Sequence, residues 1–442
     1  MLRRTLLYSL LGFLVLCVVG VFVYYLPPVH ARLAWRVNNW RVQIRRALTP
    51  SEQVIFLPQV QQDQIETIVP ATLLAFAPTS TLTVVPFPTI APDLQGSTAT
   101  LAPSPTLTMT PTPIPGNISL TGIRYERQTF NNCGPANLAM ALSYWDWQGD
   151  QRDTRAYLRP NHASVDDKNV SPFEMVDFVE TKTQLGALTR VGGEVDLLKR
   201  LIAAGFPVVI EKGHHPQDDW WMGHYLVLTA YDDEGQRFIA QDSLLGADLP
   251  LPYAELEPWW RNFNDIYIVI YPVEREPEVL GMLGPQADPD YNYQYAAQKA
   301  RDEIASLSGR DLYFAWYNLG TNLVALGDYT GAAGAYDQAF LINAALPEKD
   351  RLHRMLWYQD GPYQAYFYTG RYAEVIELGN ATLSWVGEPV LEETFYWMGL
   401  AREAQGDFEK AIYDLNKVIE INPNNTQASG RLKNLVEGVP GS

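Results

Sequence analysis

Cysteine is nearly absent from this sequence, which contains only two in 442 residues, Cys17 and Cys133. Cys17 lies in an apolar run near the N-terminus, so a domain exported beyond that run would hold one thiol and no intrachain disulfide. A free thiol outside the cell is a liability unless it is buried or used chemically. Cys133 therefore requires an explanation, either in packing or in reactivity.

Positive charge is also scarce, because 33 Lys and Arg against 50 Asp and Glu give a net charge of −17 at pH 7. Binding of nucleic acid needs Lys and Arg against the phosphates, so we expect no nucleic-acid partner. A phosphate-binding loop of the GxxxxGK[ST] type is missing from the sequence as well. This absence argues against a nucleotide-driven transporter within the same chain.

Charged residues are missing altogether from positions 5–26, and about 20 apolar residues are enough to span a bilayer as a helix. Two arginines precede this run, so we predict a transmembrane signal anchor at residues 1–31. The C-terminal domains would then lie outside the cytoplasm of a single-pass membrane protein. A signal peptide cleaved after Val29–Ala31 and a lipid attached to Cys17 are the alternatives.

The composition changes several times between the apolar run and the C-terminus. Residues 32–65 are a predicted juxtamembrane segment, and residues 66–116 are a predicted disordered linker, because their frequent prolines block helices and sheet ladders. Residues 117–273 are predicted to form a compact domain, residues 274–287 a short linker, and residues 288–436 a helical domain.

Residues 117–273 combine helical and strand patterns in an order typical of an α+β fold. Helical periodicity comes first, at residues 134–147, 171–184 and 194–204. Strand-like runs follow, at residues 206–212, 225–231, 237–243 and 265–272. The second and third runs flank Asp-Asp-Glu-Gly, which predicts a hairpin, so we expect N-terminal helices packed on an antiparallel sheet.

The predicted helical domain contains an internal repeat of helical hairpins. Its spacing is carried in one copy by Trp316, Leu319, Gly320, Tyr329, Ala332, Tyr336 and Ala339, and in another by Gly399, Phe408, Ala411 and Pro423. The small residues let two helices approach, while the large ones fill the gap to the next hairpin. This spacing resembles tetratricopeptide repeats, and the resemblance implies an all-α solenoid that binds a protein partner.

Cys133 stands in the sequence Asn-Asn-Cys-Gly-Pro-Ala, at the start of the first predicted helix. Pro135 suits the first helical turn, where its missing N–H costs nothing. Unpaired N–H groups at a helix N-terminus stabilise a thiolate and lower the pKa of a thiol. A small core residue is the alternative, but the irregular polar approach through Asn131 and Asn132 favours a reactive thiol.

A thiolate nucleophile needs a base and a group that orients the base. His224 opens the first strand of the predicted hairpin, and Asp242 closes the second strand. If residues 231–235 form the loop, Ala230 pairs with Gln236, and His224 lies directly opposite Asp242 on the same face, about 5 Å away. A four-residue loop without a bulge would place the two side chains on opposite faces of the sheet.

Together these features resemble the papain superfamily, with Cys-Gly-Pro-Ala opening a helix and Gly-His-Tyr opening a strand. Over residues 120–272 the chain is similar to cysteine peptidase family thirty-nine, the bacteriocin-leader-processing type, in its stand-alone branch. The resemblance implies Cys133 as nucleophile, His224 as base and Asp242 as the orienting carboxylate. It also implies an oxyanion-hole glutamine, for which Gln128 is the candidate, although it lies five rather than six residues before the cysteine.

The sequence thus predicts an N-terminal transmembrane helix, an α+β papain-like domain and an all-α tetratricopeptide solenoid. The predicted function is that of a membrane-anchored, extracytoplasmic cysteine peptidase whose partners are a peptide or protein substrate, a protein bound by the repeats, and the membrane. A silent peptide-binding scaffold, or an amidase or amide transferase with the same triad, stays open. His214 and His215 lack a third ligand at suitable spacing, so we predict no metal and no cofactor. We expect four tryptophans either at the border of the cleft or in packing at an edge strand: Trp220, Trp221, Trp259 and Trp260.

Overall fold

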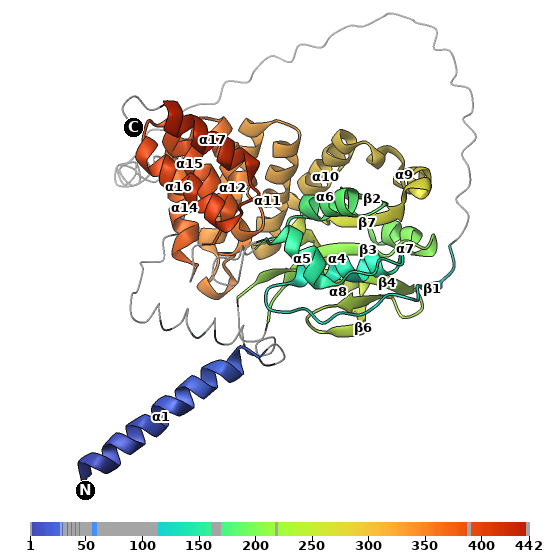
Figure 1. The fold of residues 1–442 in the computed structure, drawn as a ribbon. Helices are drawn as coiled ribbons and strands as arrows, with labels where there is room; N and C mark the ends of the chain where they lie inside the picture. Colours follow the sequence, from blue (N-terminus) through green and yellow to red (C-terminus); the bar gives the residue numbers. More distant parts are fainter. Residues whose placement is uncertain are drawn as a thin grey trace, which may run out of the picture. The chain divides into compact units, whose positions relative to one another are not determined.

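The computed structural model describes residues 2–26, 55–59, 114–160, 169–216, 220–386 and 390–438, with single positions between residues 29 and 44 (Figure 1). Most of the predicted juxtamembrane segment 32–65 and of the predicted linker 66–116 lies outside the described residues. The predicted domain boundaries therefore stay predictions, and the two folded regions are described here by their elements.

The first helix, α1, comprises Leu2–Tyr24. Within the ranges that the structure describes, no helix is both long enough and apolar enough to cross a membrane. The predicted membrane anchor at residues 1–31 is therefore left without structural support, and it stays a prediction from the sequence.

An antiparallel sheet of seven strands forms the centre of the first folded region (Figure 1). Its main path has the order β2-β7-β3-β4-β5-β6, and β1 pairs with the end of β4. The strands are β1 Asn117–Ser119, β2 Leu185–Arg190, β3 Val208–His214, β4 Met222–Asp232, β5 Arg237–Asp242, β6 Gly246–Pro252 and β7 Tyr267–Pro272. The four predicted strands are confirmed. The edge strand β6 was not predicted, because its two prolines hide the strand pattern and are tolerated only where one side is unpaired.

Helices cover this sheet on the side of Val209, Val227 and Ile268, where one hydrophobic cluster joins them to α4 and α6. The helices of the region are α4 Cys133–Ser143, α5 Gln151–Leu158, α6 Pro172–Lys182, α7 Val195–Ala203, α8 Tyr253–Trp260 and α9 Glu276–Leu283. Every residue of α4 after Cys133 is buried, as its alanine-rich sequence predicts. The helix ends before the predicted residue 147, because Asp146 takes a left-handed turn conformation with φ of 60°.

The second folded region is helical, as predicted, and its helices pack in chain order. They are α10 Pro289–Ile304, α11 Gly309–Ala325, α12 Tyr329–Ala345, α13 Gly361–Tyr368, α14 Tyr372–Ser384, α15 Glu392–Ala404, α16 Phe408–Ile421 and α17 Thr426–Gly438. Close approach of α11 and α12 depends on Gly320, because a Cβ there would lie 2.7 Å from the ring of Tyr336. The predicted role of this small residue is confirmed.

A short piece of the predicted juxtamembrane segment packs on the helical region. The ring of Phe56 lies 5.2 Å from that of Phe340 in α12 and 5.9 Å from that of Tyr366 in α13. Phe56 is buried in the same hydrophobic cluster as these helices. Residues 55–58 are therefore held by apolar contacts with the helices rather than extending freely.

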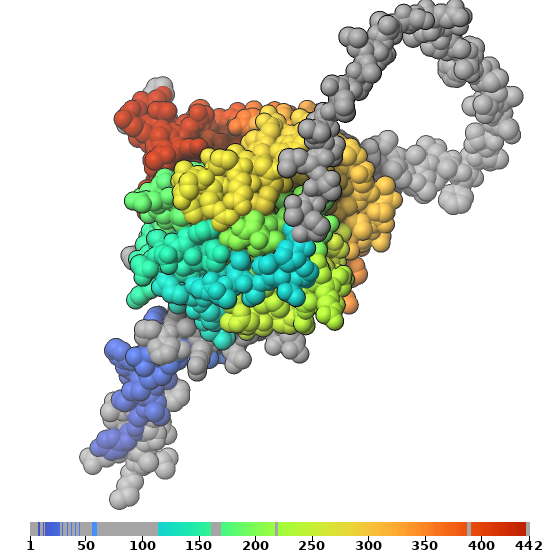
Figure 2. Space-filling view, turned by 90° about the vertical axis from the view of Figure 1, so that its right-hand side faces the viewer, coloured from blue at the N-terminus to red at the C-terminus, as the bar shows by residue number. Residues whose placement is uncertain are grey.

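The two folded regions share a hydrophobic core. Trp221 and Phe263 of the first region belong to the same cluster as Phe314 of the second, with 5.7 Å between the rings of Trp221 and Phe314. Buried Asn264 and Asn322 exchange hydrogen bonds of 2.7 and 3.1 Å across the junction. In Figure 2, the surface of the end of the first region and the start of the second (yellow) borders the earlier part of the first region (green and cyan). Separating the regions would expose this core, so functional experiments require the full chain.

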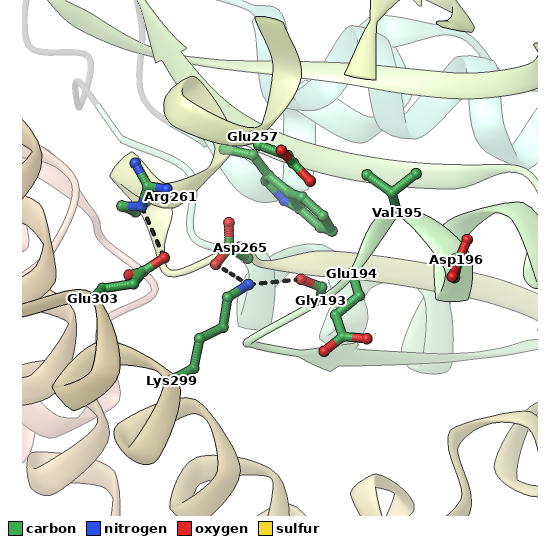
Figure 3. Close-up of a pocket in the computed structure, with 10 residues that line it drawn as sticks. Gly193, Glu194, Val195, Asp196, Glu257, Arg261, Asp265, Lys299 and Glu303 are labelled. Atoms are coloured by element: carbon green, nitrogen blue, oxygen red, sulfur yellow. Dashed lines mark hydrogen bonds and ion pairs between the residues drawn. The ribbon is translucent and has the colours of Figure 1, made fainter. Parts of the chain in front are cut away.

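Ion pairs also hold the junction, around a cavity of about 470 Å³ (Figure 3). Lys299 of α10 contacts the Asp265 carboxylate at 2.7 Å and the carbonyl of Gly193 at 3.0 Å. Arg261 pairs with Glu303 of α10 at 2.9 Å. Because both cations that line the cavity are paired with carboxylates, we interpret this cavity as part of the junction between the regions.

Candidate active site

Cys133 is the first residue of α4, and α5 holds the chain that leads to it. The side-chain amide of Asn132 donates to Gln151 at 2.8 Å, and the hydroxyl of Thr154 donates to the carbonyl of Pro135 at 2.8 Å. Pro135 lies in the first helical turn, as predicted. The sulfur is thus placed at the N-terminus of a buried helix, while the residue itself stays partly accessible.

His224 and Asp242 reach the same side of the sheet through a β-bulge rather than through the predicted register. The loop has four residues, because Asp232 pairs with Arg237, and Ala230 pairs with Ile239 instead of Gln236. The predicted direct pairing of the two functional residues is therefore wrong. An irregularity between Leu228 and Ala230 shifts the register by one residue, which restores the shared face that a four-residue loop alone would lose.

The bulge is stabilised by the residue that follows β1. Thr229, the extra residue, is buried, and its carbonyl accepts a hydrogen bond of 2.9 Å from the N–H of Leu120. Its hydroxyl contacts the carbonyl of Ile239 at 3.4 Å. A segment more than a hundred residues away in the sequence therefore supports the register that brings the two side chains together.

The side chains of His224 and Asp242 form a buried hydrogen bond of 2.8 Å between Nε2 and Oδ1. Asp242 Oδ1 also accepts from the backbone N–H groups of Leu244 and Leu245, at 2.8 and 2.9 Å. Burial alone would raise the pKa of Asp242, but the charge of His224 and these hydrogen bonds lower it to about 2. Asp242 is therefore an anion throughout the physiological range, and it fixes the orientation of the imidazole ring.

The sulfur of Cys133 is hydrogen-bonded to the His224 side chain. Since Nε2 of the ring bonds to Asp242, the nitrogen that faces the sulfur is Nδ1. Burial opposes ionisation of the thiol, but the hydrogen bond and charge of His224, with the N–H groups of Tyr225 and Gly134, lower the pKa of Cys133 below its usual value. The pKa of His224 is raised to about 9, since Asp242 and Cys133 outweigh its burial. These directions favour a thiolate beside an imidazolium.

Gln128 is held next to this group by Ser243. The backbone N–H of Gln128 donates to the Ser243 carbonyl at 2.9 Å, and the Ser243 hydroxyl donates to Gln128 Oε1 at 2.7 Å. The amide of Asn137 donates to the Ser243 hydroxyl and to the Cys133 carbonyl, both at 2.9 Å. The side-chain oxygen of Gln128 therefore faces Ser243, and the NH₂ group of the same amide is the part that could donate a hydrogen bond to an oxyanion. The chain turns at Asn131, where φ is 51°, between Gln128 and the helix.

Other sequence candidates lie elsewhere or have structural roles. The ring of His214 lies 5.7 Å from that of His224, and burial with the charge of His224 lowers its pKa to about 4. Within the described residues no group of three side chains could hold a metal ion. Trp221 and Trp260 are buried, which favours packing, the second of the two predicted alternatives, over a place at the border of the cleft. Trp221 stacks on Phe263 at the junction, with ring centroids 5.7 Å apart.

Sequence reasoning missed a buried acid close to Cys133, Glu211. It lies opposite Tyr225 in the β3–β4 register and is only 4% exposed. Burial raises the pKa of Glu211 well above its usual range, and the charge of Cys133 adds to this effect. Its neutral form is therefore favoured, which avoids a second negative charge beside the thiolate. The signal was the single acid in the otherwise apolar strand Phe-Pro-Val-Val-Ile-Glu.

Comparison with known proteins identifies two parts of the chain. Residues 120–268 match the Peptidase_C39 like family. Residues 392–425 match the tetratricopeptide repeat. Both resemblances stated from the sequence are thereby confirmed, the first for an α+β region and the second for the C-terminal helices. None of the curated proteins compared has a significant sequence match to the chain.

Solved structures resemble each part separately. A putative C39-like peptidase from Bacillus anthracis is 17% identical, with 35% of this chain and 96% of that chain covered and a TM-score of 0.31. Xylellain, a cysteine protease from Xylella fastidiosa, is 16% identical, with 36% and 87% covered and a TM-score of 0.29. The first tetratricopeptide domain of Spaghetti, bound to a peptide of HSP90, is 19% identical, with 28% and 91% covered and a TM-score of 0.25. Since these scores are low, the residue roles below follow from the geometry of this chain.

Proposed function

We propose that the protein is a cysteine peptidase, in which Cys133 is the nucleophile that attacks the peptide bond of the substrate. One observation carries the proposal: a continuous chain of contacts runs from the partly accessible sulfur through the buried His224 ring to the Asp242 carboxylate. A histidine needed only for packing would not require a buried anion on one nitrogen and a thiol on the other. The match of this region to the Peptidase_C39 like family supports the same class of reaction.

The first half-reaction is the acylation of Cys133. The thiolate attacks the carbonyl carbon of the peptide and forms a tetrahedral oxyanion, whose collapse breaks the C–N bond. Protonated His224 gives its proton to the leaving amine, so an amine product departs and a thioester remains on the sulfur. Asp242 keeps Nδ1 aimed at the reacting atoms and stabilises the charged form of the ring.

The second half-reaction is hydrolysis of the thioester. Neutral His224 takes a proton from water, and the resulting hydroxide attacks the thioester carbonyl. When the C–S bond breaks, the acid product leaves, and the sulfur returns as a thiolate beside the protonated ring. No redox partner or metal is required for either half-reaction.

The oxyanion formed in both steps needs hydrogen-bond donors. The backbone N–H of Cys133 is suited to this role, because the first N–H groups of a helix lack intrahelical acceptors. The NH₂ group of Gln128 is the second donor, with its oxygen held by Ser243. Donors of this kind contribute about 3 kcal/mol each to the stability of the transition state.

The tetratricopeptide repeats are assigned to protein binding, as solenoids of this type expose a surface for partners. Attachment of the chain to a membrane, with the peptidase outside the cytoplasm, remains a prediction from the apolar N-terminal run alone. Neither assignment affects the chemistry at Cys133.

The proposed activity is tested with a peptide library and the full chain. After incubation, mass spectrometry is expected to detect new peptide N-termini that increase with time. The matched control is the same protein after alkylation of Cys133 by iodoacetamide, which should release none of these products. Identical product sets from the alkylated and untreated protein would contradict the proposal, as would the absence of any cleavage.

A further inference from the structure

A loop of the helical region reaches residues that lie next to the segments of Cys133 and His224. Tyr358 follows the short 3₁₀ helix Met355–Trp357. Its carbonyl accepts a hydrogen bond of 3.2 Å from the side chain of Asn169, which precedes α6. Its ring lies next to Gly223, the residue directly before His224, and the backbone N–H of Gly223 opposes the rise in the pKa of its hydroxyl. Tyr358 is thus tied to both the helical side and the sheet side of the first region.

Two glycines in neighbouring strands make room for the side chains that pack at this end of the sheet, and the one beside the Tyr358 ring is Gly223. Gly213 of β3 and Gly223 of β4 are directly opposite in the register. A Cβ at Gly223 would lie 2.6 Å from the ring of Phe263 and 3.0 Å from the ring of Tyr358. Side chains at these positions would displace the aromatic rings, so the end of the sheet is shaped to receive Tyr358.

The two residues that Tyr358 adjoins, Asn169 and Gly223, lie in the segments next to Cys133 and His224. On the helical side, Asn169 is followed by Val170, whose side chain lies 3.2 Å from the position of a Cβ at Gly134, next to Cys133. The carbonyl of Val170 also accepts from the Tyr225 hydroxyl at 2.9 Å. On the sheet side, Gly223 leads directly into His224. Tyr358 therefore connects the segment that adjoins Cys133 with the segment that carries His224.

The ring of Tyr358 is also within electrostatic reach of the sulfur. Burial raises the pKa of its hydroxyl, and the charges of Cys133 and Glu211 contribute in the same direction. The ring centroid lies 5.6 Å from that of Phe263 and 5.9 Å from that of Trp221, both of which are buried. These packed neighbours restrict movement of the ring away from this position.

We propose that Tyr358 is a specificity-determining residue, with which the helical region closes one side of the catalytic groove and limits the size of the group that reaches Cys133. This proposal rests on the proposed function, since it concerns the access of substrate to the nucleophile. Its physical content is steric: a partly buried aromatic ring spans two segments that a larger substrate group would have to separate.

The test compares two thiol reagents of different size on the full chain. A Cys17→Ser background leaves Cys133 as the only thiol. Rate constants are measured for iodoacetamide and for fluorescein-5-maleimide in the presence of Tyr358 or Tyr358→Ala. We expect the maleimide reaction to become at least about tenfold faster in Tyr358→Ala, while the iodoacetamide reaction changes less than about twofold. Tyr413→Ala, on an exposed part of α16, is the matched control and should change neither rate.

Two further variants keep the test decisive. Tyr358→Phe retains the ring and should leave the ratio of the two rates near that of the wild type. Tyr358→Leu retains apolar packing at the junction, but it is too short to reach Gly223, and should raise the ratio about threefold or more. An unchanged ratio in both the Ala and the Leu variants would overturn the proposal. If iodoacetamide reacts as slowly as with an ordinary thiol in every variant while the ratio still rises, the proposed function fails and the steric role of Tyr358 stands.

Discussion

Replacement of Cys133 by alanine is expected to lower kcat/KM for peptide cleavage by at least about 10⁴-fold. Alanine removes the only atom that can form the thioester, while His224 and Asp242 keep their hydrogen bond. Residual activity would come from the oxyanion donors and from binding alone. The rate is measured with the full chain on a peptide identified from the library experiment.

The matched control for this variant is Cys17→Ala, which removes the other thiol of the chain and should leave the rate unchanged. Alanine at the first position of α4 is expected to preserve the helix. Circular dichroism of Cys133→Ala checks that the fold is retained. Cleavage at an undiminished rate by a folded Cys133→Ala protein would show that the nucleophile is elsewhere.

Replacement of Asp242 by alanine is expected to lower kcat by about 10³–10⁴-fold. The buried carboxylate makes the hydrogen bond that orients His224, and its charge is the main factor that raises the pKa of that ring to about 9. Without it, the imidazolium loses its stabilisation and the alkaline limb of the pH–rate profile moves to lower pH. The measurement is kcat as a function of pH.

A second substitution separates the charge of Asp242 from its orienting role. Asp242→Asn keeps an oxygen that can accept from His224 but removes the charge, so its loss in kcat should be smaller than that of Asp242→Ala. Both variants should shift the alkaline limb, since both remove the anion that raises the pKa of the ring. Asp290→Ala, at the exposed start of α10, is the control and should behave as the wild type. An alkaline limb that stays in place in both variants would contradict the assigned role.

Local patterns were sufficient to predict the start of the first buried helix at Cys133 and four of the strands. Cys133 at a helix N-terminus follows from Gly134 and Pro135, and the central strands follow from their apolar runs. The hairpin register could not be predicted, because the bulge at Thr229 depends on a hydrogen bond from Leu120, which follows the distant strand β1. Short-range sequence signals contain no information on such a contact.

Residues that act through tertiary contacts were missed for the same reason. Asn169 and Tyr358 are separated by 189 positions and belong to different folded regions. The glycine that receives the ring, Gly223, could be read in the sequence only as part of the Gly-His-Tyr motif. Its close approach to Tyr358 becomes visible when the helical region is packed against the sheet.

The ion pair of Cys133 and His224 is the central claim, and the pH dependence of thiol alkylation tests it most directly. In a Cys17→Ser background, the rate constant for iodoacetamide is measured from pH 5 to 10 for the wild type and for His224→Ala. An ordinary thiol with a pKa of about 8.5 reacts about 70-fold more slowly at pH 6 than at pH 8. The account predicts a decrease of less than about tenfold over this interval for the wild type, and the full decrease for His224→Ala. Coincident pH profiles for the two proteins would contradict an imidazolium-stabilised thiolate at Cys133.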